Sequence, residues 1–393
     1  MRLHQPDIVL LPLTRSGRLA DPEAYDRLQD ALPHASHCFL FCPGWLTDAA
    51  EARQGAARLF GHLDTALCPL SDRIQPLRAA VHWPSRPFAA PPEPPRDEPH
   101  PLVLEPLLAV AELVRSRPGL VDRLLVPLLE AEVPLGPEEE LELDALLSLA
   151  PDGGRGGGMP SVIRALSFWL MKRRAGQVGE RLGRELLRPA LAGLGARAPR
   201  LHLIGHSFGA NLLTAAVMSG LRPESLVLLQ GALSAFALAD EVPGTRRPGR
   251  YRPVVAEQMV AGSIVAVRSA HDRALGNLYP VVTWGTPVDR AVHDQGRRRT
   301  RDVVVRSAMG AVGARATGAP DLELLTAVTT GLPPGPVVNV DASRVITRPA
   351  WLIGAHGDIH HEAIATLILL AAGLLTGSPS GARPRRTSPL NVS

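Results

Sequence analysis

The segment 201–211 constrains the fold of this chain more than any other. An apolar run at 201–204 leads directly into Gly-His-Ser-Phe-Gly at 205–209, and small residues follow to Met218. This pattern predicts a buried strand, a sharp turn with Ser207 at its apex, and a helix. Gly205 and Gly209 let the strand end and the helix start approach closely, which forces Ser207 into a strained, exposed conformation. A tight turn with a helix-capping serine is the alternative, but it does not account for the apolar run.

Further apolar runs at regular intervals predict the rest of the architecture. We expect strands at 7–13, 38–42, 77–83, 225–230, 263–268 and 337–340. Helical patterns occupy 21–32 and 49–67, a long helix at 161–194 precedes the Ser207 strand, and an apolar helix at 364–375 ends the pattern. Strands that alternate with helices predict an α/β fold with a doubly wound, mostly parallel sheet.

Composition divides the chain into a core and two additions. Residues 1–85 and 161–376 carry the strand and helix patterns of the core. Residues 86–160 begin with a proline-rich stretch, continue as an acidic, leucine-rich block and end in glycines, so we interpret them as a helical insertion that caps the sheet. Residues 377–393 are rich in serine, proline and arginine and predict a disordered tail.

Charge and cysteine content exclude several classes of protein. The net charge of +4 is mild, Lys172 is the only lysine, and the arginines do not interleave with aromatic residues, so we expect no nucleic-acid partner. Three cysteines (Cys38, Cys42, Cys68) lack the spacing of a metal site or a disulfide framework, which favours a reducing compartment. The longest apolar stretch, 364–375, is too short to span a bilayer, and no signal sequence opens the chain. We therefore predict a cytoplasmic protein without an integral membrane segment.

A serine at such a turn needs a base, and the base needs an acid that orients it. Asp272 follows the apolar run 264–268 and lies where a parallel sheet would present an orienting carboxylate. It can alternatively cap a helix that starts at Arg273. Asp240 is the rival acid, but it lies further from its preceding strand.

The expected base is His356, which lies in a glycine-flanked loop before the terminal helix. His360 is the alternative base, although we expect His360 and His361 in the first turn of that helix. His293 lies in an arginine-rich loop before the last strand, which is the wrong place. A metal site of His356, Asp358 and His360 lacks a helical H-E-x-x-H pattern and leaves the serine turn unexplained, so we expect no metal and no cofactor.

Two backbone N–H groups can form an oxyanion hole beside the serine. Phe208, the residue after Ser207, supplies the first. The loop Phe-Cys-Pro-Gly-Trp at 41–45 supplies the second, because Gly44 permits a bend and Trp45 can donate its N–H. An ordinary strand-to-helix turn with a core tryptophan is the alternative for this loop.

Several short motifs, besides the serine turn and the ordered Ser, Asp, His set, carry a family resemblance. They are DIVLLPLT at 7–14, PGWLTD at 43–48, VHWPS at 81–85, LLQGALS at 228–234, AHDRA at 270–274 and AHGDI at 355–359. With them the chain resembles the α/β-hydrolase superfamily, and more closely the bacterial serine-esterase-like hydrolases of uncertain substrate that carry a His-Gly-Trp loop. The resemblance covers most of 5–375 apart from the insertion. Pro43 departs from it by replacing the usual histidine, which is not a triad member.

The resemblance implies the α/β-hydrolase fold and hydrolysis of a carboxylic ester, with a small-molecule ester or acyl substrate. Ser207, Asp272 and His356 are then the catalytic residues, and the N–H groups of Trp45 and Phe208 form the oxyanion hole. The same residues can serve a thioesterase, an amidase or an acyltransferase. A catalytically silent binding or scaffold protein is the alternative of a different class, and the acidic insertion could hold a protein partner.

Overall fold

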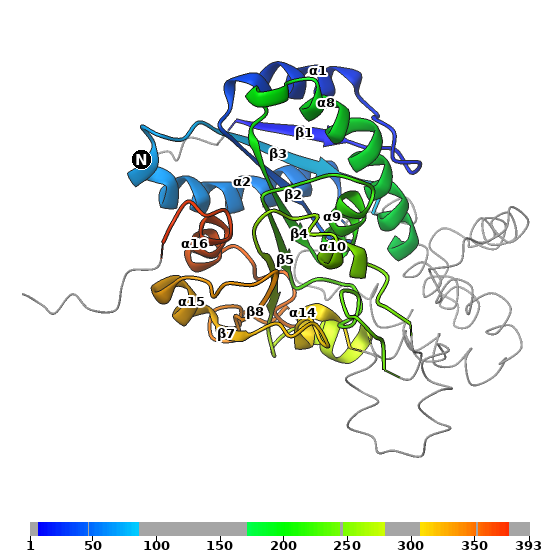
Figure 1. Ribbon diagram of the computed structural model, residues 1–393, viewed down its shortest axis with the longest axis vertical. Helices are drawn as coiled ribbons and strands as arrows, with labels where there is room; N and C mark the ends of the chain where they lie inside the picture. The colour runs from blue at the N-terminus through cyan, green and yellow to red at the C-terminus, as the bar shows by residue number, and fades with distance from the viewer. Residues whose placement is uncertain are drawn as a thin grey trace, which may run out of the picture.

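The computed structural model describes residues 7–45, 47–85, 171–243, 247–279, 307–350 and 353–376. Its centre is a single sheet of eight strands, all parallel, in the order β1-β3-β2-β4-β5-β6-β8-β7 (Figure 1). The strands are β1 (Ile8–Pro12), β2 (His37–Cys42), β3 (Pro76–His82), β4 (Arg200–His206), β5 (Ser225–Leu229), β6 (Ile264–Arg268), β7 (Asp321–Glu323) and β8 (Val337–Asp341).

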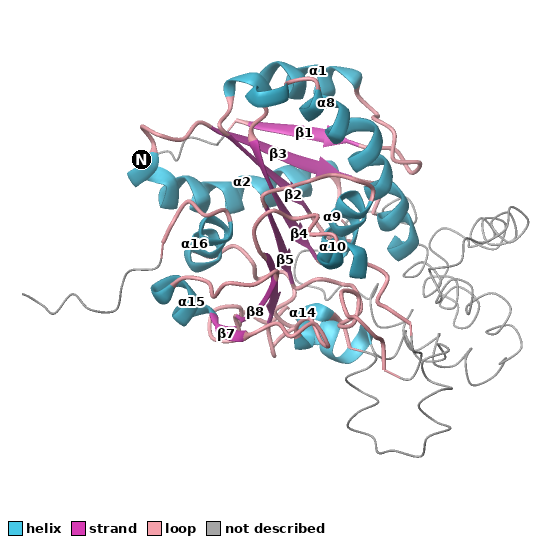
Figure 2. Ribbon diagram, in the orientation of Figure 1, coloured by secondary structure: helices cyan, strands magenta, loops and turns pink. Residues whose placement is uncertain are grey.

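Helices cover both faces of the sheet (Figure 2). One face carries α1 (Pro22–Ala31), the helix at 171–181, η4 (Leu182–Leu187), α8 (Arg188–Ala192), α9 (Phe208–Met218), α10 (Arg252–Ala256) and α14 (Met309–Val312). The other carries α2 (Ala49–Leu67), α15 (Leu324–Thr330) and α16 (Glu362–Ala371). The π-helix η6 (Ala274–Leu278) follows β6, and short 3₁₀ turns span Leu32–His34, Cys68–Leu70 and Gly195–Arg197.

Successive strand residues face opposite layers, which explains why the central strands are mostly apolar on both faces. Leu40 and Leu203 pack in the layer of α1 and α9, whereas Phe39, Phe41 and Ile204 pack in the layer of α2 and α16. A strand that is buried on both faces is a nearly continuous apolar run. The predicted doubly wound, parallel α/β fold is therefore confirmed.

Several boundaries differ from the sequence-based expectation. The long helix expected at 161–194 is described from residue 171 and changes to π geometry at η4 before α8. Strand β7 and helices α10, α14 and α15 were not predicted, because each has at most seven residues and lacks a clear hydrophobic period. The insertion 86–160 and the tail 377–393 lie outside the described residues. Over the ranges that the structure describes, no helix is long and apolar enough to cross a membrane.

Candidate active site

The site lies where the strand order reverses. From β2 the chain goes to β3 on one side and then to β4 on the other side of β2. The loops that leave β2 and β4 therefore diverge, and parallel α/β sheets bind ligands in the crevice that opens at such a point. Ser207 ends β4, and the loop 43–48 ends β2, so both lie at this reversal.

Ser207 has the backbone of a strained turn. Its φ of 55° and ψ of −122° lie in a region that residues with a side chain rarely adopt. Gly209 permits the turn, because a Cβ there would lie 2.1 Å from the carbonyl oxygen of Cys42. Gly205 likewise faces the backbone of Ala210, at 2.6 Å from a Cβ. The serine makes no capping hydrogen bond to α9, so the structure does not support the capping alternative.

The side chain of Ser207 is more enclosed than we expected, with only 5% of the residue exposed. The reason is the loop after β2. A Cβ built on Gly44 would lie 2.8 Å from Ser207 Cβ and 3.3 Å from Ser207 Oγ. The absence of a side chain at position 44 therefore leaves the space in which the hydroxyl lies.

A chain of two hydrogen bonds joins Ser207, His356 and Asp272. Ser207 Oγ is 2.8 Å from His356 Nε2, and His356 Nδ1 is 2.7 Å from Asp272 Oδ2. A carboxylate accepts hydrogen bonds, so the ring proton belongs on Nδ1 and Nε2 accepts from the serine hydroxyl. This tautomer can take up the serine proton.

Asp272 makes contacts that fit both alternatives considered for it. Its Oδ1 accepts from the backbone N–H of Leu275 at 2.9 Å and so caps the turn that begins η6. Its Oδ2 accepts from His356 Nδ1 and from Gln230 Nε2, at 2.9 Å for the glutamine. The carboxylate is fully buried, with no exposed side-chain surface.

The loops of Asp272 and His356 are paired with each other. Asp272 and Gly354 form an antiparallel bridge, and the N–H of Ala355 donates to the carbonyl of His271 at 2.9 Å. Gly354 has a φ of +61°, and a Cβ there would lie 2.2 Å from the carbonyl oxygen of His271. Gly354, two residues before His356, therefore lets the loops of Asp272 and His356 approach each other closely.

His206 holds the backbone of the same loop. Its Nε2 is 2.7 Å from the carbonyl oxygen of His356, and because a carbonyl only accepts, Nε2 carries the proton. Burial lowers the pKa of His206 to about 3, so the ring is neutral near pH 7. The two imidazole rings lie 5.0 Å apart between centroids.

The loop after β2 is held by residues that follow β3. Trp83 Nε1 donates to the carbonyl of Pro43 at 3.1 Å. Ser85 Oγ accepts from the N–H of Thr47 at 3.0 Å and donates to its carbonyl at 2.9 Å. The ring of Trp45 meets the ring of Phe208 edge to face at 6.0 Å. The two expected oxyanion-hole residues thus lie side by side next to Ser207.

The rival residues lie elsewhere. Asp240 has 73% of its side chain exposed and pairs with Arg252. His360 packs beside Gly55 of α2, and burial lowers its pKa to about 4. The expectation that His360 and His361 form the first turn of the last helix was wrong, because α16 begins at Glu362 with His361 as its N-cap.

Asp358 holds together the backbone of its own part of the chain and does not face the serine site. It accepts from the N–H groups of Thr347 and Arg348 and lies 2.9 Å from His361 Nε2. Among the residues that the structure describes, no group of three or more His, Cys, Asp or Glu side chains is placed to hold a metal. His293 lies outside the described ranges.

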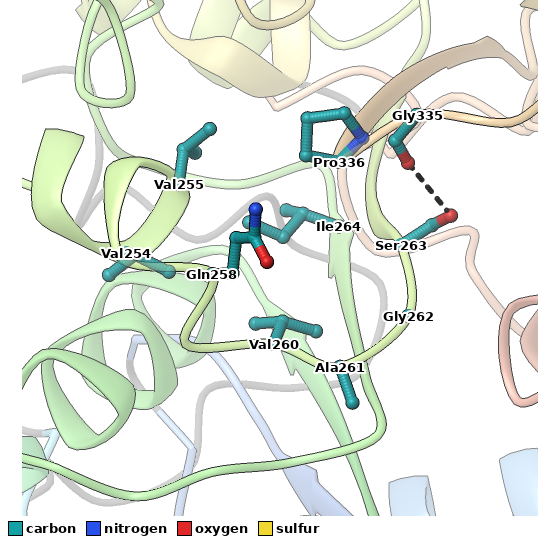
Figure 3. A pocket seen from close by; sticks show the side chains of 10 residues that line it. All are labelled: Val254, Val255, Gln258, Val260, Ala261, Gly262, Ser263, Ile264, Gly335 and Pro336. Atoms are coloured by element: carbon teal, nitrogen blue, oxygen red, sulfur yellow. Dashed lines mark hydrogen bonds between the residues drawn. The ribbon is translucent and has the colours of Figure 1, made fainter.

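One hollow of about 450 Å³ lies away from this site (Figure 3). It opens at the amino end of β6, between α10 and the turn before β8, and is lined by Val254, Val255, Gln258, Val260, Ala261, Gly262, Ser263, Ile264, Gly335 and Pro336. Ser207, Asp272 and His356 follow the opposite ends of their strands. The hollow is therefore not part of the serine site.

Sequence reasoning gave no role to Gln230 or His206 and missed how Trp83 and Ser85 hold the loop. In the sequence, the motifs that contain these residues indicate only a family resemblance. The signal that could have identified them is a polar residue in an otherwise apolar segment, directly after a strand or in the serine turn. Their partners depend on strand order, which the sequence does not specify.

Comparison of the chain with family models, with curated proteins and with solved structures found no match. The interpretation of the site therefore depends on its own geometry.

Proposed function

We propose that this chain is a serine hydrolase of the α/β-hydrolase superfamily that cleaves a carboxylic ester through an acyl-enzyme on Ser207. The observation that supports the proposal is the continuous contact from Ser207 Oγ through the His356 ring to the Asp272 carboxylate, at 2.8 and 2.7 Å. A strained serine backbone at the reversal of a parallel sheet adds weight to it.

In this mechanism Ser207 Oγ attacks the ester carbonyl while His356 Nε2 takes up the hydroxyl proton. Asp272 stabilises the resulting imidazolium, and the N–H groups of Trp45 and Phe208 bind the oxyanion. The imidazolium then returns its proton to the leaving alcohol, and the acyl group remains on Ser207. A water molecule, activated by His356, attacks the acyl-enzyme and releases the acid. The N-terminus of α9 favours the negative charge that develops beside it.

The proposal predicts that Ser207→Ala abolishes ester hydrolysis and leaves the fold intact. We expect kcat on p-nitrophenyl esters to fall by about 10³-fold or more, because the nucleophile is lost. Ser219→Ala, at the other end of α9, is the matched control and should retain full activity. A fluorophosphonate probe should label the wild-type protein and not Ser207→Ala.

A second pair of variants tests the acid. Asp272→Asn should lower kcat by about 10³-fold with little change in KM, whereas Asp240→Asn should have no effect.

Wild-type turnover in Ser207→Ala would disprove the proposal. A wild-type protein that neither hydrolyses esters nor reacts with the probe would support a silent binding or scaffold protein.

The same assay with a panel of p-nitrophenyl esters determines which acyl chain length the protein prefers. Thioester, amide and acyl-transfer substrates use the same nucleophile and belong in the panel. The cytoplasmic location and a protein partner for the insertion 86–160 stay predictions.

A further inference from the structure

Gln230 lies in the centre of the proposed site, at the end of the strand beside that of Ser207. It directly follows β5, its side chain is fully buried, and its φ is +45°. A residue with a side chain rarely adopts this conformation. Ser207, which ends the neighbouring strand, has a similar φ of 55°.

The glutamine amide contacts both Asp272 and the loop that carries His356. Its Nε2 is 2.9 Å from Asp272 Oδ2 and 3.3 Å from the carbonyl oxygen of Ala355, the residue before His356. Both partners are acceptors, so the NH₂ group must face them. One side chain thus links the carboxylate to the loop that carries the base.

Asp272 Oδ2 needs this second donor. The carboxylate is enclosed, and in the described part of the chain its ion-pair partner is His356 alone. A buried carboxylate is stabilised in its charged form by the hydrogen bonds that it accepts. Gln230 and His356 donate to the same oxygen, so the glutamine fixes the direction in which that oxygen faces the ring.

Gln230 is also an unfavourable residue for its place. Its Oε1 is buried and has no hydrogen-bond partner among the described residues. A buried acceptor without a donor and a left-handed backbone both cost free energy. Such features concentrate at functional sites, where a specific contact compensates for them.

From this geometry we infer that Gln230 is a positioning residue: its amide holds the Asp272 carboxylate and the His356 loop so that the imidazole stays aligned with Ser207. The inference depends on the proposed function, because it assigns a role within the same site.

Gln230→Met keeps the length of the side chain and removes the donor. We expect kcat to fall by about 10- to 100-fold, the loss of one charge-assisted hydrogen bond, with KM within about twofold. Gln258→Met is the matched control, since Gln258 has a φ of +50°, is exposed and lines the hollow at the other edge of the sheet.

Gln230→Gly separates the effect of the side chain from the effect of the backbone conformation. Glycine adopts a positive φ without strain, so a purely structural role would leave this variant active. The positioning role predicts a loss of kcat as large as that of Gln230→Met, again with KM within about twofold. Full activity in Gln230→Gly would overturn the inference.

An NMR measurement keeps the test independent of catalysis. The proton between His356 Nδ1 and Asp272 Oδ2 should give a downfield resonance in the wild-type protein, and in Gln230→Met it should shift and exchange faster with water. An unchanged resonance, or an unchanged kcat, would contradict the inference. A wild-type protein that shows the resonance but lacks esterase activity would contradict the proposed function alone.

Discussion

At the scale of single residues, the room around the Ser207 hydroxyl depends on a residue with no side chain. Gly44 lies on a different strand end, yet a Cβ there would lie 2.8 Å from Ser207 Cβ. That distance is shorter than a normal contact between carbon atoms. The Ser207 hydroxyl and the loop that contains Gly44 therefore pack directly against each other.

This packing makes Gly44→Ala a sensitive variant. We expect the added methyl group to displace Ser207 or the loop, and kcat on p-nitrophenyl esters to fall by about 10²-fold or more, because a displacement of about 1 Å is costly in an aligned site. Gly61→Ala is the control: a Cβ at Gly61 meets nothing within 4 Å, and alanine should stabilise α2 by about 0.5–1 kcal/mol. An active Gly44→Ala variant would show that the loop can move aside without cost.

Site residues whose positions follow from the order of the strands along the chain could be predicted. Residues that contact the site from a neighbouring strand could not. The expected positions of Ser207, Asp272 and His356 came from the order of the strands along the sequence, and the structure brings the three side chains together. Gln230 reaches Asp272 only because β5 and β6 are neighbours in the sheet. A pairing of that kind becomes visible only when the register is known.

At the scale of elements, the loop after β2 is secured by the end of β3. Trp83 is nearly fully buried, at 1% exposed, and its indole N–H holds the carbonyl of Pro43. Proline at position 43 has no N–H of its own with which to hold the loop. Trp83 and Ser85 anchor the loop from the neighbouring strand instead.

Trp83→Phe should loosen this loop. We expect a fall in kcat of about tenfold and a loss of about 1 kcal/mol in the free energy of unfolding, because one buried hydrogen bond disappears. Tyr25→Phe is the matched control: it removes the bond from Tyr25 to the carbonyl of Leu186, between α1 and the helix at η4. It should lower the denaturation temperature similarly and leave kcat unchanged. Equal kcat losses in both variants would indicate a general effect of stability.

Long elements could be predicted and short ones could not. The boundaries of α2 were correct because its 19 residues give a clear hydrophobic period, whereas β7 has only three residues. The long helix before β4 was expected to be uniform, but it contains the π segment η4. That change of geometry occurs where the helix packs against α9, a neighbour that the sequence does not reveal.

At the scale of the whole molecule, the interior holds several neutral histidines. His37 and His202 share a hydrogen bond of 2.9 Å at the amino edge of the sheet, and His202 also meets Ser225 Oγ at 2.9 Å. Burial lowers the pKa of His202 to about 3 and also lowers the pKa of His37. The folded protein therefore keeps these rings neutral at a pH where the unfolded chain would protonate them.

The protein should lose stability as the pH falls below about 6.5, the ordinary pKa of histidine. Below that value the unfolded chain binds a proton that folded His202 does not bind until about pH 3, so His202 alone lowers the free energy of unfolding by about 1.4 kcal/mol per pH unit. Denaturant titrations at several pH values measure this slope. His202→Gln should reduce it, whereas His34→Gln, at an exposed position, should not change it. An unchanged slope in His202→Gln would contradict the assignment.

The contact between Ser207 and His356 joins residues 149 positions apart in the chain. During synthesis the serine turn leaves the ribosome well before the loop that carries the histidine. In the nascent protein the Ser207 hydroxyl therefore lacks the His356 ring until β8 and the loop after it have been made, since domains fold from the N-terminus as they emerge. In the proposed enzyme, activity would appear only after the loop that carries His356 has been made, which would spare the growing chain and its neighbours from premature acylation.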